Sequence, residues 1–138
     1  MIEAKSEREW IVRLQDGEDV VETLRDLDAA SAVILTGIGM VRDAELAYWN
    51  GHAYATHAHS DPSELVSLQG NVALDETGAR VVHAHACLAG PGGATAGGHL
   101  VRATVHNTLE LTLLPLNAIA LDRRREDGGL VGLYPRTR

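Results

Sequence analysis

The chain of 138 residues has no phenylalanine, and its aromatic side chains are limited to two tryptophans and three tyrosines. A hydrophobic core therefore has to be aliphatic, and the hydrophobic fraction of 45% is ordinary for a globular protein. Because single cores typically span roughly 100–200 residues, we expect one domain over residues 1–138.

Long hydrophobic runs are also absent. No apolar run reaches the roughly 18 residues that a transmembrane helix needs, and the amino-terminus is charged, with no hydrophobic signal segment. The single cysteine, Cys87, cannot form an internal disulfide. Its apolar neighbours favour a buried small hydrophobic side chain over a metal thiolate. These features predict a cytoplasmic protein with no membrane partner.

Positive charge is scarce. Lys and Arg together number 12 against 19 Asp and Glu, giving a net charge of −7. This balance disfavours broad contact with phosphate backbones, so we do not expect direct nucleic-acid binding. The one basic cluster, Arg123-Arg124-Arg125, is followed at once by Glu126 and Asp127, and this pattern predicts a solvent-exposed turn.

Only one segment has convincing helical periodicity. Val20, Val21, Leu24 and Leu27 recur at intervals of one, four and seven residues, which predicts an amphipathic helix of about three turns. An acidic start at residues 16–19 suits its amino-terminal end.

The rest of the chain has the short apolar runs and alternation that are typical of β-strands. Thr36-Gly37-Ile38-Gly39 predicts a glycine loop, Asn50-Gly51 predicts a hairpin, and residues 100–116 fit either one bent strand or two. We expect strands at residues 9–14, 32–35, 44–49, 53–59, 65–74, 80–88, 100–116, 119–121 and 130–133, with a large loop over residues 89–98.

Three histidines stand out by their spacing. His83 and His85 alternate on one predicted strand and share its face. His99 follows the glycine-rich segment after that strand, and an antiparallel hairpin of suitable register would place it opposite His85 or Cys87 on the same face. Three convergent imidazoles are a known donor set for transition metals, zinc above all. The pattern therefore predicts a divalent metal, zinc in the first instance, at His83, His85 and His99. Hydrogen-bonded histidines on a polar sheet face are the alternative.

The remaining candidate residues have weaker support. His57 and His59 also share a strand face, but they lack a third partner and fit exposed hairpin residues. His52 and His106 fit surface or hydrogen-bonded positions. The polar stripe on the strand over residues 65–74 fits either solvent exposure or the lining of a trimer interface or ligand pocket; it consists of Ser67, Gln69 and Asn71. Ser67 has no nucleophile-elbow setting, which argues against a serine hydrolase.

In order along the chain, four segments carry a family resemblance: Leu35-Thr36-Gly37-Ile38-Gly39 with Val41-Arg42-Asp43, Glu64-Leu65-Val66-Ser67-Leu68-Gln69-Gly70-Asn71, His83-Ala84-His85, and Gly97-Gly98-His99-Leu100. With these segments the chain resembles the plants-and-prokaryotes-conserved (PPC) domain over about residues 8–135. The resemblance implies an α/β (α+β) fold with a largely antiparallel sheet and one main α-helix, assembled as a homotrimer. By family position, Glu64 is the best carboxylate candidate near the histidines. The AT-hook that accompanies this domain in plants is missing from the chain, and both Cys87 and the His57/His59 pair depart from the family pattern.

Three functions compete at this point. The first is a trimeric PPC-domain protein that binds a divalent metal through His83, His85 and His99, with an unidentified small-molecule ligand. The second is a DNA-binding or transcription-regulatory module. The third is a metal-dependent enzyme acting on a small molecule, since zinc with an open position can activate water. No general base is evident beside the histidines, so a binding or structural metal is preferred.

Overall fold

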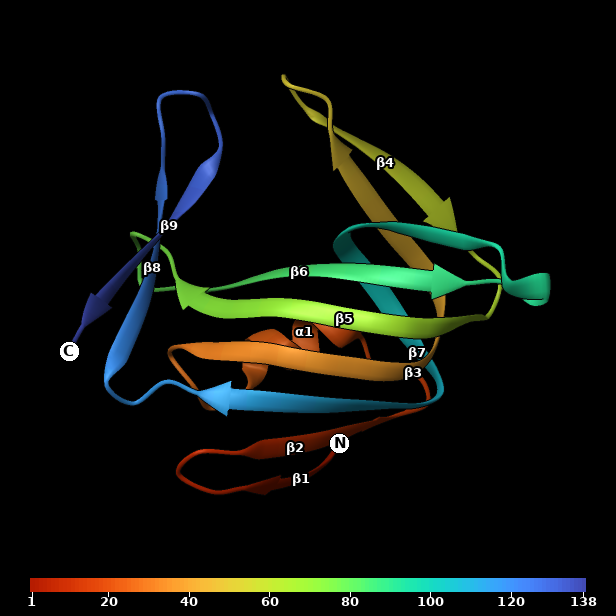
Figure 1. The fold of residues 1–138 in the computed structure, drawn as a ribbon, viewed down its shortest axis with the longest axis horizontal. Helices are drawn as coiled ribbons and strands as arrows, with labels where there is room; N and C mark the ends of the chain where they lie inside the picture. Colours follow the sequence, from red (N-terminus) through yellow and green to blue (C-terminus); the bar gives the residue numbers. More distant parts are fainter.

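The computed structural model describes all of residues 1–138 as a nine-stranded sheet with one short α-helix and one 3-10 turn (Figure 1). In chain order the elements are β1 (Ile2–Lys5), β2 (Trp10–Gln15), α1 (Val20–Asp26), β3 (Ala32–Trp49), β4 (Tyr54–His59), β5 (Ser63–Leu74), β6 (Arg80–Ala89), η1 (Pro91–Gly93), β7 (Thr95–Pro115), β8 (Ile119–Arg125) and β9 (Val131–Thr137). The predicted fold class is confirmed in its coarse form: mostly β-sheet with one helix. No helix is long and apolar enough to cross a membrane.

The sheet is antiparallel apart from one short parallel contact between β5 and β8. Its main path runs β1-β2-β7-β3-β5-β8-β9, while β4 pairs with β3. Strand β6 pairs with both β5 and β7. As a result, β3, β5, β6 and β7 form a closed circuit of hydrogen-bonded neighbours, and the strands that carry the three histidines have partners on both sides.

Helix α1 packs its apolar side into the core. Asp19 caps its amino-terminus, with the carboxylate accepting a hydrogen bond from the Glu22 amide at 2.9 Å. Val20, Val21 and Leu24 are buried in a core that is aliphatic except for Trp10. The helix has seven residues and is shorter than predicted. Leu27, counted in the helical periodicity, has an extended ψ of 140° that ends the helix, although its side chain is still buried.

The predicted glycine loop at residues 36–39 is wrong, because β3 runs through it as one strand of 18 residues. The glycines are needed for close packing instead. A Cβ on Gly37 would lie 2.9 Å from the Cβ of Leu68, and Gly39 has a φ of +146° with the backbone of Leu109 2.7 Å from an added Cβ. Register shifts between β3 and β7 flank this segment, between Ile34 and Thr36 and between Gly39 and Val41, and allow the long strand to bend.

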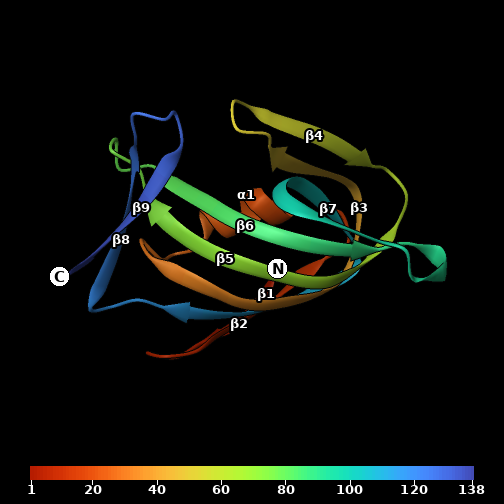
Figure 2. The same cartoon turned by 45° about the horizontal axis from the view of Figure 1, so that its top comes forward.

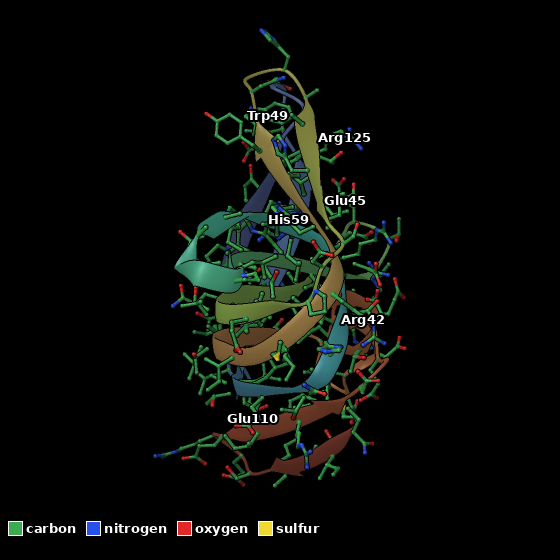
Figure 3. All side chains as sticks on the ribbon, turned by 90° about the vertical axis from the view of Figure 1, so that its right-hand side faces the viewer. Arg42, Glu45, Trp49, His59, Glu110 and Arg125 are labelled. Atoms are coloured by element: carbon green, nitrogen blue, oxygen red, sulfur yellow. The ribbon has the colours of Figure 1, made fainter.

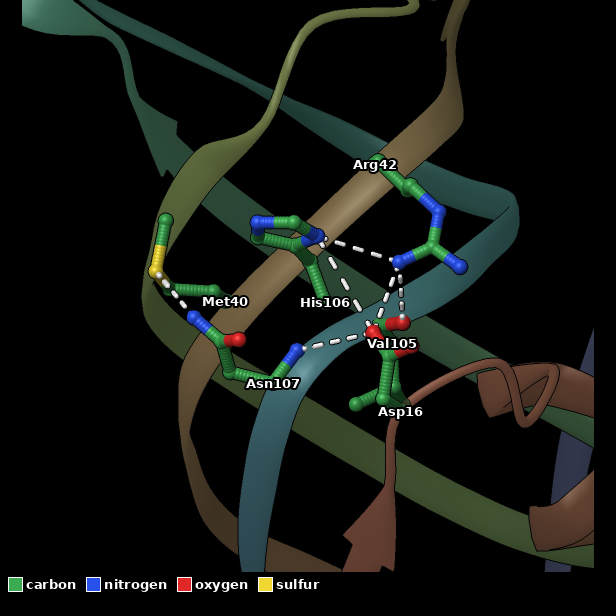
Figure 4. A network of polar contacts seen from close by, with 6 residues as sticks. All are labelled: Asp16, Met40, Arg42, Val105, His106 and Asn107. Carbon is green, nitrogen blue, oxygen red and sulfur yellow. Dashed lines mark hydrogen bonds and ion pairs between the residues drawn. The ribbon is translucent and has the colours of Figure 1, made fainter.

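Strand β7 is one bent strand of 21 residues, so the segment at 100–116 is not two strands. It begins at Thr95, and the predicted loop over 89–98 is correspondingly shorter. The bend is at Asn107, whose φ is +68°. Asp16 accepts a hydrogen bond from the Asn107 amide at 3.0 Å and another from Arg42 at 2.7 Å, and His106 lies against the same Arg42 (Figure 4). His106 is thus hydrogen-bonded, one of the two settings predicted for it.

Two hairpins project beyond this body. One is the β3–β4 hairpin, whose turn contains Asn50-Gly51 as predicted, with Trp49 opposite Tyr54. The other is β8–β9, and Figures 1 and 2 show both rising on the same side of β5 and β6. Strand β8 continues to Arg125. The predicted turn is therefore wrong, because Arg123, Arg124 and Arg125 are strand residues, and the predicted exposure is wrong for Arg123 but confirmed for Arg124 and Arg125.

Candidate metal centre

The three predicted histidines meet where β6 pairs with β7. His85 lies directly opposite His99, and His83 is two residues before His85 on the same face of β6. One ring nitrogen from each of the three lies within 4.8 Å of the other two. The ring centroids are 5.1 to 5.6 Å apart. The predicted hairpin register is confirmed.

Small residues around His99 make this approach feasible. In the register of β6 and β7, Gly98 lies opposite Ala86 and Gly97 opposite Cys87. A Cβ on Gly98 would lie 2.8 Å from the carbonyl oxygen of Ala47 on β3. Strand β3 can pack directly against the backbone beside His99 only because this position has no side chain.

Burial and neighbouring positive charge favour the neutral imidazole at His83 and His99. The pKa of His83 is lowered to about 4, first by desolvation and then by the charges of Arg123, His99 and His85. Desolvation also lowers the pKa of His99, with smaller contributions from His85 and Arg123. Neutral imidazole is the form that offers a lone pair to a metal, so these shifts favour the protonation state that a metal site needs.

Arg123 is part of this site, which the sequence interpretation missed. The residue is 6% exposed, and its Nη2 donates hydrogen bonds to Asn71 Oδ1 at 2.9 Å and to His83 Nδ1 at 2.8 Å. Its Nη1 donates to the carbonyl of Val131 at 3.2 Å. A detectable sequence signal existed, because Arg123 is two residues from Leu121 and therefore shares its strand face.

The hydrogen bond from Arg123 fixes the tautomer of His83 in this structure. A neutral imidazole that accepts at Nδ1 carries its proton on Nε2 and has no free lone pair. Coordination through either nitrogen therefore requires Arg123 to release His83. His99, by contrast, has a ring nitrogen that no hydrogen bond occupies, because its Nδ1 is buried without a hydrogen-bond partner.

The donor set fits a divalent transition metal. Tetrahedral zinc with bonds of about 2.0–2.1 Å brings its nitrogen ligands to roughly 3.3 Å from one another, so the imidazoles need to close by side-chain rotation from separations within 4.8 Å. Three protein ligands leave one coordination position open.

The other sequence candidates lie outside this cluster. Cys87 is half-buried and is not among the three grouped ligands. His57 is exposed and His59 half-buried on β4, and His52 is exposed in the loop before it. Glu64, the carboxylate expected near the histidines, is exposed and pairs with Ala89 at the far end of β6 from His83.

The polar stripe on β5 lies opposite the histidine strand. Ser67, Gln69 and Asn71 pair with Cys87, His85 and His83 respectively. Asn71 holds Arg123, so this end of the stripe supports the site. Strand alternation predicts that Val66 shares the core side of β5 with Leu68, and this is wrong, because a register shift between Leu65 and Ser67 leaves Val66 51% exposed.

Comparison with known proteins gives a consistent result. Residues 1–117 match the model of the Plants and Prokaryotes Conserved (PCC) domain. The crystal structure of a plant- and prokaryote-conserved protein from Pyrococcus horikoshii has 27% sequence identity and a TM-score of 0.85, with 96% of this chain and 94% of that chain covered. A protein from Archaeoglobus fulgidus described as metal-containing has 30% identity and a TM-score of 0.82 over 91% of this chain and 92% of that one.

A provisionally named DNA-binding protein from Ralstonia eutropha is 23% identical, with a TM-score of 0.78 over 91% of each chain. At this identity the likeness extends to the fold alone. No curated protein matches the chain.

Proposed function

Since the chain belongs to the plants and prokaryotes conserved domain family, we propose that it binds one divalent transition metal, zinc in the first instance, through His83, His85 and His99. The observation that carries the proposal is the convergence of three imidazole nitrogens within 4.8 Å of one another. The buried, partnerless Nδ1 of His99 adds to it, since buried polar atoms in proteins are normally satisfied. The description of the A. fulgidus relative as metal-containing supports the same function.

A bound zinc ion would supply Lewis acidity at its open position. The chain itself would hold the ion on a rigid support, because β6 and β7 each have a strand on both sides. Glu64, the best carboxylate candidate by family position, pairs with Ala89 at the far end of β6 from His83, so no general base is evident beside the histidines. Binding is therefore preferred over catalysis as the role of the site.

The test is metal content per chain in protein purified without an affinity tag. Wild-type protein reconstituted with zinc and desalted should hold one zinc per chain. His83→Ala, His85→Ala and His99→Ala should each lower the retained zinc several-fold, because two imidazoles make a much poorer site than three. His57→Ala is the matched control, since His57 is an exposed histidine on β4 and should leave zinc content unchanged.

Two results would end this proposal. One is wild-type protein that is free of metal after reconstitution. The other is full zinc occupancy in all three variants of the histidine triad (His83, His85 and His99). Supplying Co²⁺, Ni²⁺ and Mn²⁺ in competition would identify the preferred ion, since the order of affinities depends on ligand type and geometry.

We also propose that the chain assembles as a homotrimer. Several large apolar side chains are about half exposed on its strands, among them Ile11 at 50%, Ile38 at 54% and Val66 at 51%. Exposed apolar surface of this kind is typical of association interfaces, and a closed symmetric assembly would cover it. Light scattering should give about three times the chain mass of 14.8 kDa, and a stable monomer at micromolar concentration would contradict the proposal. The cytoplasmic location stays a prediction.

A further inference from the structure

A pocket of about 770 Å³ opens directly beside the histidines. His83, His99 and Arg123 contribute to its inner wall, and the β3–β4 hairpin contributes Trp49 and Tyr54. Its other side is the β8–β9 hairpin. Figure 3 shows Trp49 and Arg125 at the same end of the molecule, and both line this space. The volume is in the usual range for small-molecule sites, about 300–1,000 Å³.

The buried guanidinium of Arg123 has no anionic partner. The acceptors of its three hydrogen bonds, on Val131, Asn71 and His83, are all uncharged, and none of the ion pairs in the structure involves it. Its Nε is buried without any partner. A buried charge without a counter-charge is costly, and an incoming anion would remove that cost.

The carboxylates at the pocket do not neutralise Arg123. Asp75 turns back into its own loop, accepting hydrogen bonds from the Thr77 and Ala79 amides and the Thr77 hydroxyl. Glu126 accepts a hydrogen bond from the Tyr134 hydroxyl. Both lie on the turns at the pocket's edge, as does the exposed Glu76. The inner wall is therefore cationic, and the edge has mixed charge.

The remaining wall is apolar and aromatic. Tyr54 packs against Trp49 with ring centroids 5.2 Å apart and against His99 at 5.1 Å. This row of rings leads from the tip of the β3–β4 hairpin to the histidines. Val131, which also lines the pocket, is 45% exposed, and the flat side of a ligand could cover it.

We propose that this pocket binds a small organic carboxylate, with its carboxylate group held by Arg123 and its apolar or aromatic body against Trp49 and Tyr54. An arginine fork is well matched to a carboxylate. The inference is independent of the metal, because it stands on the pocket and the unpaired guanidinium. If zinc occupies the triad as well, the release of His83 by Arg123 frees further N–H groups for the anion.

The experiment uses benzoate as the probe and benzamide as its neutral counterpart, in calorimetric titrations of the full chain. Benzoate should bind between about tenfold and a hundredfold more tightly than benzamide, the range expected for one hydrogen-bonded charge. Arg123→Gln should abolish this preference, and Trp49→Ala should weaken both probes. Arg102→Gln is the control, because Arg102 is an exposed strand arginine paired with Glu45 and does not line the pocket.

Arg123 is buried, so its variant can fail to fold, and a second measurement avoids that problem. In wild-type protein the Arg123 Nε–H resonance should shift on addition of benzoate and stay in place with benzamide. Equal binding of the two probes, no binding at millimolar concentration, or an unmoved resonance would overturn the proposal. Tighter binding of inorganic phosphate than of benzoate would show that the ligand class is wrong.

His85→Ala separates this proposal from the metal proposal. His85 is a triad member that does not line the pocket. The variant should retain several-fold less zinc and keep its preference for benzoate. Loss of that preference together with zinc would mean that the metal alone holds the anion, and the role assigned to Arg123 would be wrong.

Discussion

Replacing Gly70 with alanine should destabilise the protein at the seam between β5 and β6. Gly70 lies opposite Ala84. An added Cβ would overlap the carbonyl oxygen of His83 and lie 2.7 Å from the Cα of Ala84. These are backbone atoms, so no side chain can rotate away, and the two strands have to move apart.

The size of the effect follows from two opposing contributions. Overpacking costs about 1–3 kcal/mol, and the upper half of that range applies because the clash is with backbone. The lower entropy of an unfolded chain with alanine returns about 0.4–1 kcal/mol. A net loss of about 2 kcal/mol lowers the melting temperature by roughly 6–10 °C for a chain of this length.

Differential scanning calorimetry measures that shift, and Gly128→Ala is the matched control. Nothing lies within 4 Å of a Cβ built on Gly128, and its φ is not in the left-handed region. The control should change stability by no more than about 0.5 kcal/mol. If Gly70→Ala melts within one or two degrees of the control (about 0.5 kcal/mol), the inference that β5 and β6 are too close at Gly70 to accept a Cβ is wrong. The same substitution displaces the backbone of His83 and should weaken zinc binding.

Three further predictions concern other parts of the molecule. Leu24→Ala, at a position with 0% exposure, should cost about 2–5 kcal/mol in urea unfolding, and a loss below 1 kcal/mol would mean that α1 does not seal the core. The pKa of Asp16 is lowered by hydrogen bonds from Arg42 and the Asn107 amide, so its stabilisation is complete above the unfolded pKa of about 3.9 and is lost as the pH falls through the lower folded value. Asp16→Asn should therefore show a shallower fall in urea midpoint between pH 5 and pH 2 (about the carboxylate range), and an unchanged slope would argue against the network in Figure 4. Finally, a gel-shift series with random and A·T-rich duplexes at physiological salt should show no complex, given the net charge of −7, whereas sequence-selective binding would revive the regulatory alternative.

The sequence was sufficient for the local features of the fold. Periodicity identified the helix region and most strands, and the Asn50-Gly51 hairpin forms where the dipeptide predicts it. It failed where tertiary packing changes what a local signal means. Gly37 and Gly39 suggest a loop in isolation, yet the structure uses them to bring β3 close to β7. The helix ends at Asp26, earlier than the periodicity predicts, because Leu27 reaches the core in an extended conformation.

The candidate site was predictable in part. Alternation put His83 and His85 on one face, and hairpin parity brought His99 to them. Arg123 was not predicted as a site residue, because three adjacent arginines followed by acidic residues are typical of a solvated surface. The strand face that it shares with Leu121 was the one local signal, but its burial also depends on the parallel pairing of β8 with β5 at Leu74, which joins distant segments of the chain.

The position of β7 between β2 and β3 determines the order in which this protein can form. Trp10 on β2 pairs with Leu113, and Ala32 on β3 pairs with Pro115. Both neighbours are therefore synthesised long before the strand that joins them. At about 5–20 residues per second, the edges of β2 and β3 that face β7 stay unpaired for several seconds while the rest of the chain emerges. Folding dominated by such distant pairings is slow, and the unpaired edges expose the chain to aggregation until β7 is complete.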